Sequence, residues 1–527
     1  MQNVIVLDTT LRDGSQGEGI AYSLNDKIRI AEKLDELGVH YIEGGWPGSN
    51  PKDALFFSAM AKRRFKNSRI SAFGSTRRAG ITPAKDRNLK ELIASEAKVV
   101  TIFGKSWLLH VKNVLRTTPE ENLTMICDSV NFLTKKGVTV FYDAEHFFDG
   151  YRDDPAYALR TLKAAVDGGA SFIVMCDTNG GCLPSAISRI TGEIKREVHA
   201  PLGIHCHNDG GVAIANSIAA VEAGCAMVQG TINGYGERCG NADLIPLIAD
   251  LSLKLGMRTI PKENLSKLTE VSHFIAEVSN MRHLDNQPYA GESAFAHKAG
   301  VHINAMMKDG RSYQHLDPAL VGNRSRVLVS ELGGKSGILL LAKDFNLDLT
   351  KDDPKTKKLH KLLQELEMKG FHFEAAEGSF ELLLKKALYK VKEFFKLESF
   401  RVVVNRDSDK RISTEAIIKL RVNGKIEHTA AEGDGPVNAL DNALRKALKD
   451  FYPNLAKMHL SDFKVRVLEE KAGTAARVRV LIQSQDEKDS WNTIGVHENI
   501  IEASWMALTD SVEYKLLKDA GIRKKAA

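Results

Sequence analysis

Residues 4–14 have the sequence VIVLDTTLRDG, and residues 25–38 have the sequence NDKIRIAEKLDELG. The first segment predicts a short strand that ends in polar side chains, and the second predicts a helix that closes on Gly38 as its C-cap. This succession continues to residue 270, with expected strands at Val4–Leu7, Tyr41–Glu43, Ile70–Phe73, Val99–Phe103, Val138–Tyr142, Phe172–Met175, Gly203–Cys206 and Met227–Thr231. Eight strand–helix units in roughly 250 residues predict an α/β fold, a (β/α)8 TIM barrel, with an open doubly wound sheet as the alternative.

The pattern of apolar residues changes twice in the rest of the chain, near residue 271 and near residue 396. Helical patterns predominate between residues 271 and 395, including the stretch from Glu381 to Phe395. From residue 396 to residue 527 apolar and polar residues alternate, which predicts antiparallel strands at Arg401–Val404, Ala416–Val422, Phe463–Val467 and Arg477–Ile482. The sequence therefore predicts a barrel at 1–270, helical linker subdomains at 271–395 and a C-terminal α+β domain at 396–527.

The C-terminal domain contains an internal repeat. Six residues between Gly435 and Leu448 recur, identical or similar, sixty positions later between Gly495 and Leu508. A duplicated strand–strand–loop–helix unit explains this recurrence. The glycine-bearing segments 432–435 and 493–495 are expected to form the loops that lead into the two helices.

Composition excludes several classes of protein. Of the 527 residues, 43% are hydrophobic and 27% are charged, and the net charge is +6, which predicts a soluble globular chain. Basic and acidic residues are interleaved, so nucleic-acid binding gains little support. No signal peptide or membrane-length apolar run is present, and the six cysteines form no CxxC pair, so we expect a cytoplasmic protein with reduced thiols and no membrane partner.

Polar residues follow the expected strands at the ends that form the active-site face of such barrels. His205 and His207 are two residues apart in a strand, so both imidazoles point to the same side. Asp13 adds a carboxylate and Asn241 a neutral oxygen. This set suits a divalent cation with open positions, and Mn²⁺, Mg²⁺, Zn²⁺ and Co²⁺ are all compatible. The alternatives are an incidental histidine pair and an N-cap or surface ion pair of Asp13 with Arg12.

Three segments carry a family resemblance: LDTTLRDG at 7–14, HCHND at 205–209 and GYGERCGN at 234–241. They stand in the order found in the 2-isopropylmalate, homocitrate and citramalate synthases, which the chain resembles over essentially its whole length. The resemblance implies an acyltransferase that condenses acetyl-CoA, its co-substrate, with a 2-oxo acid and then hydrolyses the thioester. It also implies a C-terminal regulatory domain.

The resemblance also assigns roles to individual residues. It implies that the metal ligands are Asp13, His205, His207 and Asn241. It implies that Arg12 and Thr178 hold the 2-oxo acid, with Arg12 also stabilising the alkoxide. Glu145 and His302 are the candidates for proton transfer, and which of them is the base stays open. Tyr313 lies in a segment similar to one at the acyl-CoA end of the site.

Each of these residues also has a structural alternative. Glu145 could be a strand-end ion-pair partner and Thr178 the N-cap of the next helix. His302 could be a solvated helical histidine, and Tyr313 could serve only packing.

Two further segments resemble the citramalate synthase branch: EGGWPGSNP at 43–51 and YDAEHFFDGY at 142–151. This implies pyruvate as the acceptor, isoleucine as the effector of a homodimer, and a place in isoleucine biosynthesis. The main alternative is a 2-isopropylmalate synthase that uses 2-oxoisovalerate. The sequence does not indicate which side chains line the acceptor pocket.

More distant alternatives belong to other classes. A hydroxymethylglutaryl-CoA lyase carries a catalytic cysteine after the eighth strand and lacks the C-terminal domain, whereas this loop contains Glu237-Arg238-Cys239-Gly240. A biotin-dependent transcarboxylase is disfavoured because no Met-Lys-Met motif occurs. An amino-acid sensor that kept the barrel only as a scaffold is disfavoured by the full set of expected metal ligands.

Overall fold

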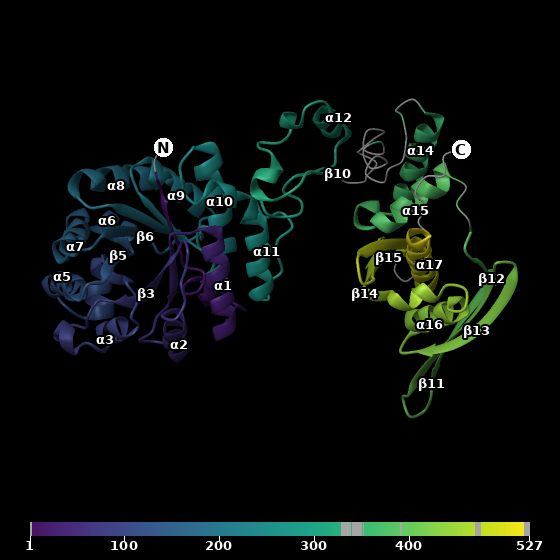
Figure 1. Ribbon diagram of the computed structural model, residues 1–527, viewed down its shortest axis with the longest axis horizontal. Coiled ribbons are helices and arrows are strands. Elements are labelled where there is room, and N and C mark those ends of the chain that lie inside the picture. Colours follow the sequence, from purple (N-terminus) through teal and green to yellow (C-terminus); the bar gives the residue numbers. More distant parts are fainter. Residues whose placement is uncertain are drawn as a thin grey trace. The chain divides into compact units, whose positions relative to one another are not determined.

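The structure of the chain is a computed structural model that describes residues 3–327, 339, 350, 353–389, 391, 393–468 and 476–520. It divides into two compact units. The barrel unit comprises Met1–Phe295 together with Leu316–Ser325, and the C-terminal unit comprises Ala296–His315 together with Arg326–Ala527. In Figure 1 the barrel unit runs from purple to teal, and most of the C-terminal unit is green to yellow.

Eight parallel strands close into a barrel, with β1 paired to β8. The strands are β1 (Ile5–Asp8), β2 (Tyr41–Gly45), β3 (Arg69–Ser75), β4 (Val99–Lys105), β5 (Thr139–Glu145), β6 (Phe172–Asp177), β7 (Leu202–Cys206) and β8 (Met227–Gly230). Each overlaps one of the eight expected strands, so the predicted TIM barrel is confirmed.

Helices follow the strands and cover the outside of the barrel (Figure 1). They are α1 (Leu24–Leu37), α2 (Pro51–Met60), α3 (Arg87–Ala94), α4 (Leu108–His110), α5 (Pro119–Lys135), α6 (Phe147–Asp153), α7 (Pro155–Gly168), α8 (Pro184–Glu197), α9 (Ala213–Glu222), α10 (Leu244–Ala249) and α11 (Leu268–Val278). The first of them begins with a capping box at Ser23 and Asp26 and ends at Gly38, which has a φ of 94°. The local sequence thus determines both ends of α1.

The inside of the barrel is packed with side chains. One buried apolar cluster of strand residues consists of Leu7, Val99, Phe141, Val174, Cys176 and Met227. A larger apolar layer lies between the strands and the helices and includes Val6, Ile42, Val100 and Ile204. The barrel is therefore a packed core, and its pocket can open only toward one end.

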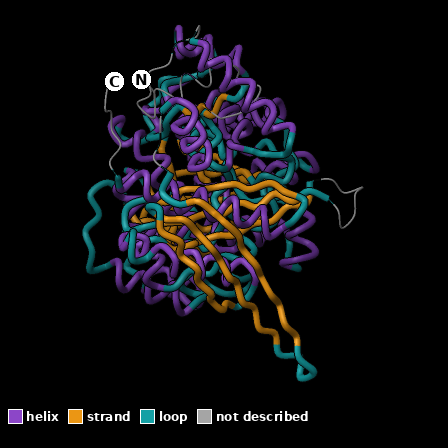
Figure 2. The backbone as a smooth tube through the Cα atoms, turned by 90° about the vertical axis from the view of Figure 1, so that its right-hand side faces the viewer, coloured by secondary structure: helices purple, strands orange, loops and turns teal. Residues whose placement is uncertain are grey.

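The C-terminal unit begins with β9 (Ala296–His297), which pairs in parallel with β10 (Arg326–Val327), and α12 (Gly300–Lys308). Helices α14 (Pro354–Met368) and α15 (Glu377–Leu388) follow. The chain then forms β11 (Lys396–Arg406), β12 (Ile412–Val422), β13 (Lys425–Gly433), α16 (Pro436–Leu448), β14 (His459–Val467), β15 (Val478–Gln485), β16 (Ser490–His497) and α17 (Ile500–Asp519). Figure 2 shows β11 and β12 as a long hairpin.

Two halves with the same order, three antiparallel strands and then a helix, make up this domain. The expected duplicated α+β domain is therefore confirmed. Ala443 and Ala447 on α16 and their counterparts Ala503 and Ala507 on α17 are all buried in one apolar core. Small buried residues at the same helical positions explain why the repeat is visible in the sequence.

Two details of the sequence prediction are wrong. Residues 493–495 lie inside β16 rather than in a loop. Gly495 is needed there because a Cβ atom would come within 1.9 Å of the carbonyl oxygen of Ala503 on α17. In addition, α15 ends at Leu388, and Phe394 and Phe395 pack into the core of the C-terminal domain without continuing the helix. Apolar residues before a strand imitated helical spacing at this point.

Candidate active site

A pocket of about 240 Å³ opens at the carboxyl ends of the barrel strands. Its lining residues are Arg12, Asp13, Gln16, Trp46, Phe73, Phe103, Asp143, Glu145, Cys176, Thr178, His205, His207, Glu237 and Arg238. Six of the nine site residues expected from the sequence are in this set. The barrel topology therefore brings together side chains as far apart in the sequence as Arg12 and Arg238.

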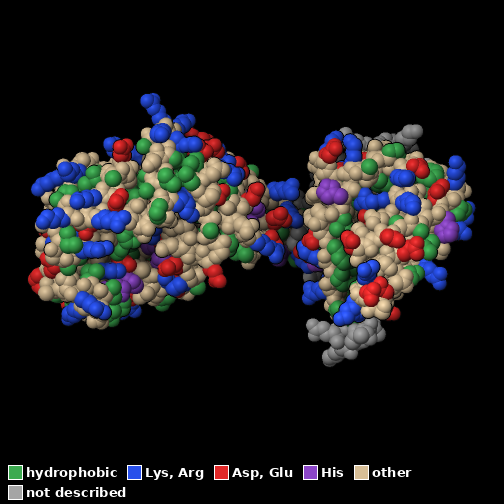
Figure 3. Space-filling view, turned by 90° about the horizontal axis from the view of Figure 1, so that it is seen from below, with side chains coloured by type: hydrophobic (Ala, Val, Ile, Leu, Met, Phe, Trp, Pro, Cys, Tyr) green, Lys and Arg blue, Asp and Glu red, His purple; other side chains and the backbone are tan. Residues whose placement is uncertain are grey.

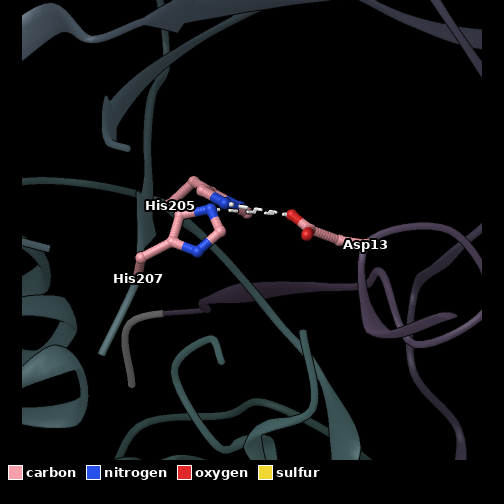
Figure 4. A group of neighbouring side chains, drawn as sticks. All are labelled: Asp13, His205 and His207. Atoms are coloured by element: carbon pink, nitrogen blue, oxygen red, sulfur yellow. Dashed lines mark ion pairs between the residues drawn. The ribbon is translucent and has the colours of Figure 1, made fainter. Parts of the chain in front are cut away.

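The centre of the pocket is a cluster of Asp13, His205 and His207, all of them buried. Their ligand atoms lie within 4.8 Å of one another. Asp13 Oδ2 is 3.4 Å from His205 Nε2 and 3.9 Å from His207 Nε2 (Figure 4). His205 is on β7 and His207 follows its end, so the two-residue spacing places both rings on one side of the strand.

The charges of this cluster favour metal binding. Burial lowers the pKa of His205 to about 3, so its imidazole is neutral and has a free lone pair. Burial alone would raise the pKa of Asp13, but the charged guanidinium of Arg12 opposes this, and the pKa lies below its ordinary value. The cluster thus offers one carboxylate and two neutral imidazoles, which are the protonation states that a divalent ion requires.

Asn241 lies in the loop after β8, and its backbone forms a bridge with that of His207. Its side-chain amide donates a hydrogen bond to the carbonyl oxygen of Tyr235 at 2.9 Å. Its Oδ1 atom is buried and has no hydrogen-bond partner among the described residues. A buried carbonyl oxygen without a donor is costly unless something else binds it, so this atom fits the role of a fourth ligand.

Arg12 lies beside the cluster of Asp13, His205 and His207, and three neighbouring residues contact its side chain. Its Nε donates to Glu43 Oε2 at 2.6 Å, and its Nη1 is 3.3 Å from Asp13 Oδ2. The guanidinium carbon lies 3.8 Å from the centre of the Phe73 ring. These contacts fix the plane of the guanidinium at the wall of the pocket.

Glu145 ends β5 and forms an ion pair with Lys105, its register partner on β4. It also lines the pocket. Glu145 is therefore both a strand-end ion-pair partner and a residue of the pocket.

Thr178 follows β6 and is a pocket residue. Its hydroxyl oxygen accepts a hydrogen bond from the backbone N–H of His146 at 2.9 Å, and its carbonyl oxygen accepts one from Arg238 at 2.8 Å. The N-cap alternative is wrong, because the N-cap of α8 is Leu183.

His302 and Tyr313 belong to the C-terminal unit. His302 is on α12 and exposed, and its ring stacks on that of Tyr313 with centroids 4.1 Å apart and an interplanar angle of 25°. Two residues that the sequence indicated separately are therefore direct neighbours.

Comparison with known proteins extends over the whole chain. Residues 3–275 match the HMGL-like family, residues 290–369 the homocitrate synthase post-HMGL domain-like family, and residues 374–516 the LeuA allosteric (dimerisation) domain. The (R)-citramalate synthase of Aquifex aeolicus is 54% identical over 520 residues, which cover 98% of each chain. That of Geobacter sulfurreducens is 54% identical over 523 residues, which cover 99% of each chain.

The chain belongs to the citramalate synthase family. By contrast, the 2-isopropylmalate synthase of Methanocaldococcus jannaschii is 30% identical over 519 residues, which cover 98% of this chain and 95% of the relative. The expected family resemblance is thus confirmed, and this member of the citramalate synthase family is an enzyme of the acyltransferase type.

The family match also covers the expected regulatory region, since a LeuA-type domain occupies residues 374–516. Among the described residues, none of the helices combines the length and apolar composition needed to cross a membrane. Figure 3 shows basic and acidic side chains mixed over the visible face of each unit.

Sequence reasoning missed several pocket residues in this member of the family. Trp46, Phe73 and Phe103 line the pocket and come from the ends of β2, β3 and β4. The rule that found the polar residues, the carboxyl end of each strand, would also have found these three rings. Two residues outside the pocket lining were also missed: Lys105 pairs with Glu145 on β5, and Gln229 lies 3.0 Å from His205 Nδ1. Both contacts join neighbouring strands and leave no local pattern in the sequence.

Proposed function

We propose that this chain condenses acetyl-CoA with pyruvate and hydrolyses the resulting thioester, giving citramalate and CoA for isoleucine biosynthesis. The observation that carries the proposal is the 54% identity with (R)-citramalate synthases over nearly the whole chain. The small pocket with its aspartate, two histidines and arginine supports it.

Asp13, His205, His207 and the free Oδ1 of Asn241 would hold a divalent ion, which we propose to be Mn²⁺ or Mg²⁺, with Zn²⁺ and Co²⁺ also compatible. Such an ion supplies Lewis acidity to the keto group of the bound oxo acid. A mixed set of nitrogen and oxygen donors with open positions is the donor set that such ions accept.

Arg12 stabilises the negative charge that develops on the keto oxygen when the new carbon–carbon bond forms. Its guanidinium is planar, permanently charged and already oriented by Glu43 and Phe73, so no reorganisation is needed during the reaction. The hydroxyl group of Thr178, which also lines the pocket, binds the carboxylate of the oxo acid.

The reaction also requires removal of a proton from the methyl group of acetyl-CoA. Glu145 is the candidate within the pocket, and its ion pair with Lys105 fixes its position at the end of β5. His302 is the second candidate, and Tyr313 stacks on it at the expected acyl-CoA end. The acetyl carbanion then attacks the keto carbon, the keto oxygen takes up a proton, and water releases CoA as its thiol.

Residues 1–270, 271–395 and 396–527 would serve as catalytic barrel, linker subdomains and regulatory domain. We further propose a homodimer whose C-terminal domain binds isoleucine. The match of residues 374–516 to the LeuA allosteric (dimerisation) domain supports both assignments.

The test is a CoA-release assay with acetyl-CoA and a panel of 2-oxo acids. The kcat/KM for pyruvate should exceed those for 2-oxoisovalerate and 2-oxoglutarate, and the product should be citramalate. A higher value for 2-oxoisovalerate would indicate a 2-isopropylmalate synthase. Cleavage of hydroxymethylglutaryl-CoA without any condensation would indicate the lyase alternative.

A further inference from the structure

Three aromatic rings form one wall of the pocket: Trp46, Phe73 and Phe103. The phenyl rings stack with centroids 5.5 Å apart, and the indole meets the edge or face of each at 5.7 Å. Arg12 lies over Phe73 at 3.8 Å, so this wall adjoins the residue proposed to hold the oxo acid. The acceptor's alkyl group can therefore contact this apolar wall while its keto oxygen faces Arg12.

The indole of Trp46 is fixed at its outer end by Asn88 on α3. Trp46 Nε1 donates to Asn88 Oδ1 at 2.7 Å, and Asn88 Nδ2 donates to the carbonyl oxygen of Ser75 at 2.7 Å. The carbonyl oxygen of Ser75 can only accept a hydrogen bond, so the amide nitrogen of Asn88 must face it. The amide oxygen of Asn88 then faces the indole N–H. Asn88 therefore has one orientation, and it fixes the position of the ring.

The backbone of Trp46 is fixed independently. Its N–H donates to Asp53 Oδ2 at 2.8 Å, and Asp53 forms a buried ion pair with Lys27. Gly45 has a φ of 138°, and a Cβ atom there would lie 2.4 Å from the carboxyl group of Asp53. The chain after β2 is thus packed directly against this carboxylate, and Trp46 is held at both its backbone and its side chain.

We propose that Trp46 is a specificity-determining residue that limits the size of the acceptor's side chain, and that Asn88 is its positioning residue. The inference rests on the proposed condensation with a 2-oxo acid. A methyl group fits beside a fixed indole, whereas a longer or branched side chain requires the ring to move. Movement breaks the bond to Asn88 and leaves a half-buried amide oxygen without its donor.

Size selection of this kind is limited in magnitude. One methylene group changes discrimination in an apolar pocket by roughly 10–200-fold. We therefore expect Trp46→Phe and Asn88→Ala each to lower the ratio of kcat/KM for pyruvate to kcat/KM for 2-oxobutanoate by about tenfold or more. The change should come mainly from a lower KM for 2-oxobutanoate.

Asn88→Asp supplies the conservative variant. It keeps an acceptor for the indole N–H but loses the hydrogen bond to the carbonyl oxygen of Ser75, so its ratio should lie between those of the wild type and Asn88→Ala. Two matched controls report general damage. Trp505→Phe changes a buried tryptophan in the C-terminal unit. Asn216→Ala removes a buried helical asparagine whose amide donates to the carbonyl oxygen of Cys182 at 2.9 Å. Both should leave the ratio unchanged.

The experiment separates the two levels of the proposal. If the wild-type chain does not release CoA with pyruvate, the proposed function is wrong. If it does, and Trp46→Phe and Asn88→Ala lose activity equally toward both acids, the size limit is set elsewhere and the inference is overturned. If Trp46→Phe lowers the ratio but Asn88→Ala leaves it unchanged, Asn88 is not the residue that positions the indole.

Discussion

Gln229 determines which nitrogen of His205 faces Asp13. His205 Nδ1 lies 3.0 Å from Gln229 Oε1, and Gln229 Nε2 donates to Asp143 Oδ1 at 3.0 Å. Since the amide oxygen can only accept, Nδ1 carries the proton. The other nitrogen, Nε2, then presents its lone pair toward Asp13, as a metal ligand must.

We expect Gln229→Leu to weaken metal binding. Leucine has a similar volume to glutamine, but it offers no acceptor for His205 Nδ1–H. Loss of such an outer contact typically weakens metal affinity about 10–100-fold. Calorimetric titration of Mn²⁺ into the metal-free full-length chain measures this directly. Gln483→Leu on β15 is the control, and a Gln229→Leu affinity within twofold of wild type would contradict the prediction.

Removal of the metal should abolish turnover. A chelator should reduce CoA release to background, and added Mn²⁺ or Mg²⁺ should restore it. The His205→Ala/His207→Ala double variant should neither bind Mn²⁺ in the titration nor recover activity, because two of the three clustered ligands are lost. Full turnover by the chelated enzyme or by the double variant would show that the cluster is not a catalytic metal site.

Glu145→Gln should separate chemistry from metal binding. The amide cannot accept the methyl proton, so kcat should fall by about 10²–10⁴-fold, the usual contribution of a positioned general base. Metal affinity should change little, since Glu145 is outside the cluster of Asp13, His205 and His207. The matched control is Glu197→Gln, an exposed glutamate at the end of α8. A near-normal kcat for Glu145→Gln would leave His302 as the base.

The sequence was sufficient for features that depend on local periodicity. Strand and helix patterns located the eight barrel strands, and the two-residue spacing of His205 and His207 predicted that both rings share a side. These predictions succeed because alternation in a strand is fixed by backbone geometry.

Other features depend on contacts between distant segments and left no local pattern. In the sequence nothing distinguishes Asn88 from other residues in the first turn of a helix. Only the fold brings its amide to the indole of Trp46. Gly495 resembled a loop residue, yet it lies in a strand because α17 packs against it. A contact across 42 positions has no periodicity from which it could be inferred.

Isoleucine should bind the full-length chain and inhibit it. An inhibitor must bind the less active state more tightly than the active one, and coupling of about 1–3 kcal/mol is typical. The affinity for isoleucine should therefore be about 5–150-fold higher in the less active state than in the active state. Calorimetric titration, with rates measured in parallel and alanine as a control, tests this. Absence of both binding and inhibition would leave the C-terminal domain with a structural role only.

The last prediction concerns stability and a single carboxylate on α17. Asp510 is partly buried, and its Oδ2 accepts a hydrogen bond at 2.6 Å from Ser379 Oγ, which in turn accepts one from the backbone N–H of Ile494. Burial raises the pKa of Asp510 to about 6 from its ordinary value of 3.8. Between these two values the folded state binds more protons than the unfolded state, so the contribution of Asp510 to stability falls as the pH rises through this window.

Above the folded-state pKa the charged carboxylate therefore destabilises the C-terminal unit. Its two-unit shift, discounted for partial exposure to solvent, corresponds to about 1–2 kcal/mol. Asp510→Asn keeps an acceptor for Ser379 and removes the charge. It should raise the free energy of unfolding at pH 8 by about this amount and much less at pH 4.

Urea unfolding of both chains at several pH values measures the difference, in which the titration of all other groups cancels. Asp450→Asn, at an exposed position after α16, is the control and should show no such dependence. A difference that does not change with pH, or a less stable Asp510→Asn chain at pH 8, would mean that the hydrogen bond from Ser379 outweighs the cost of burying the charge.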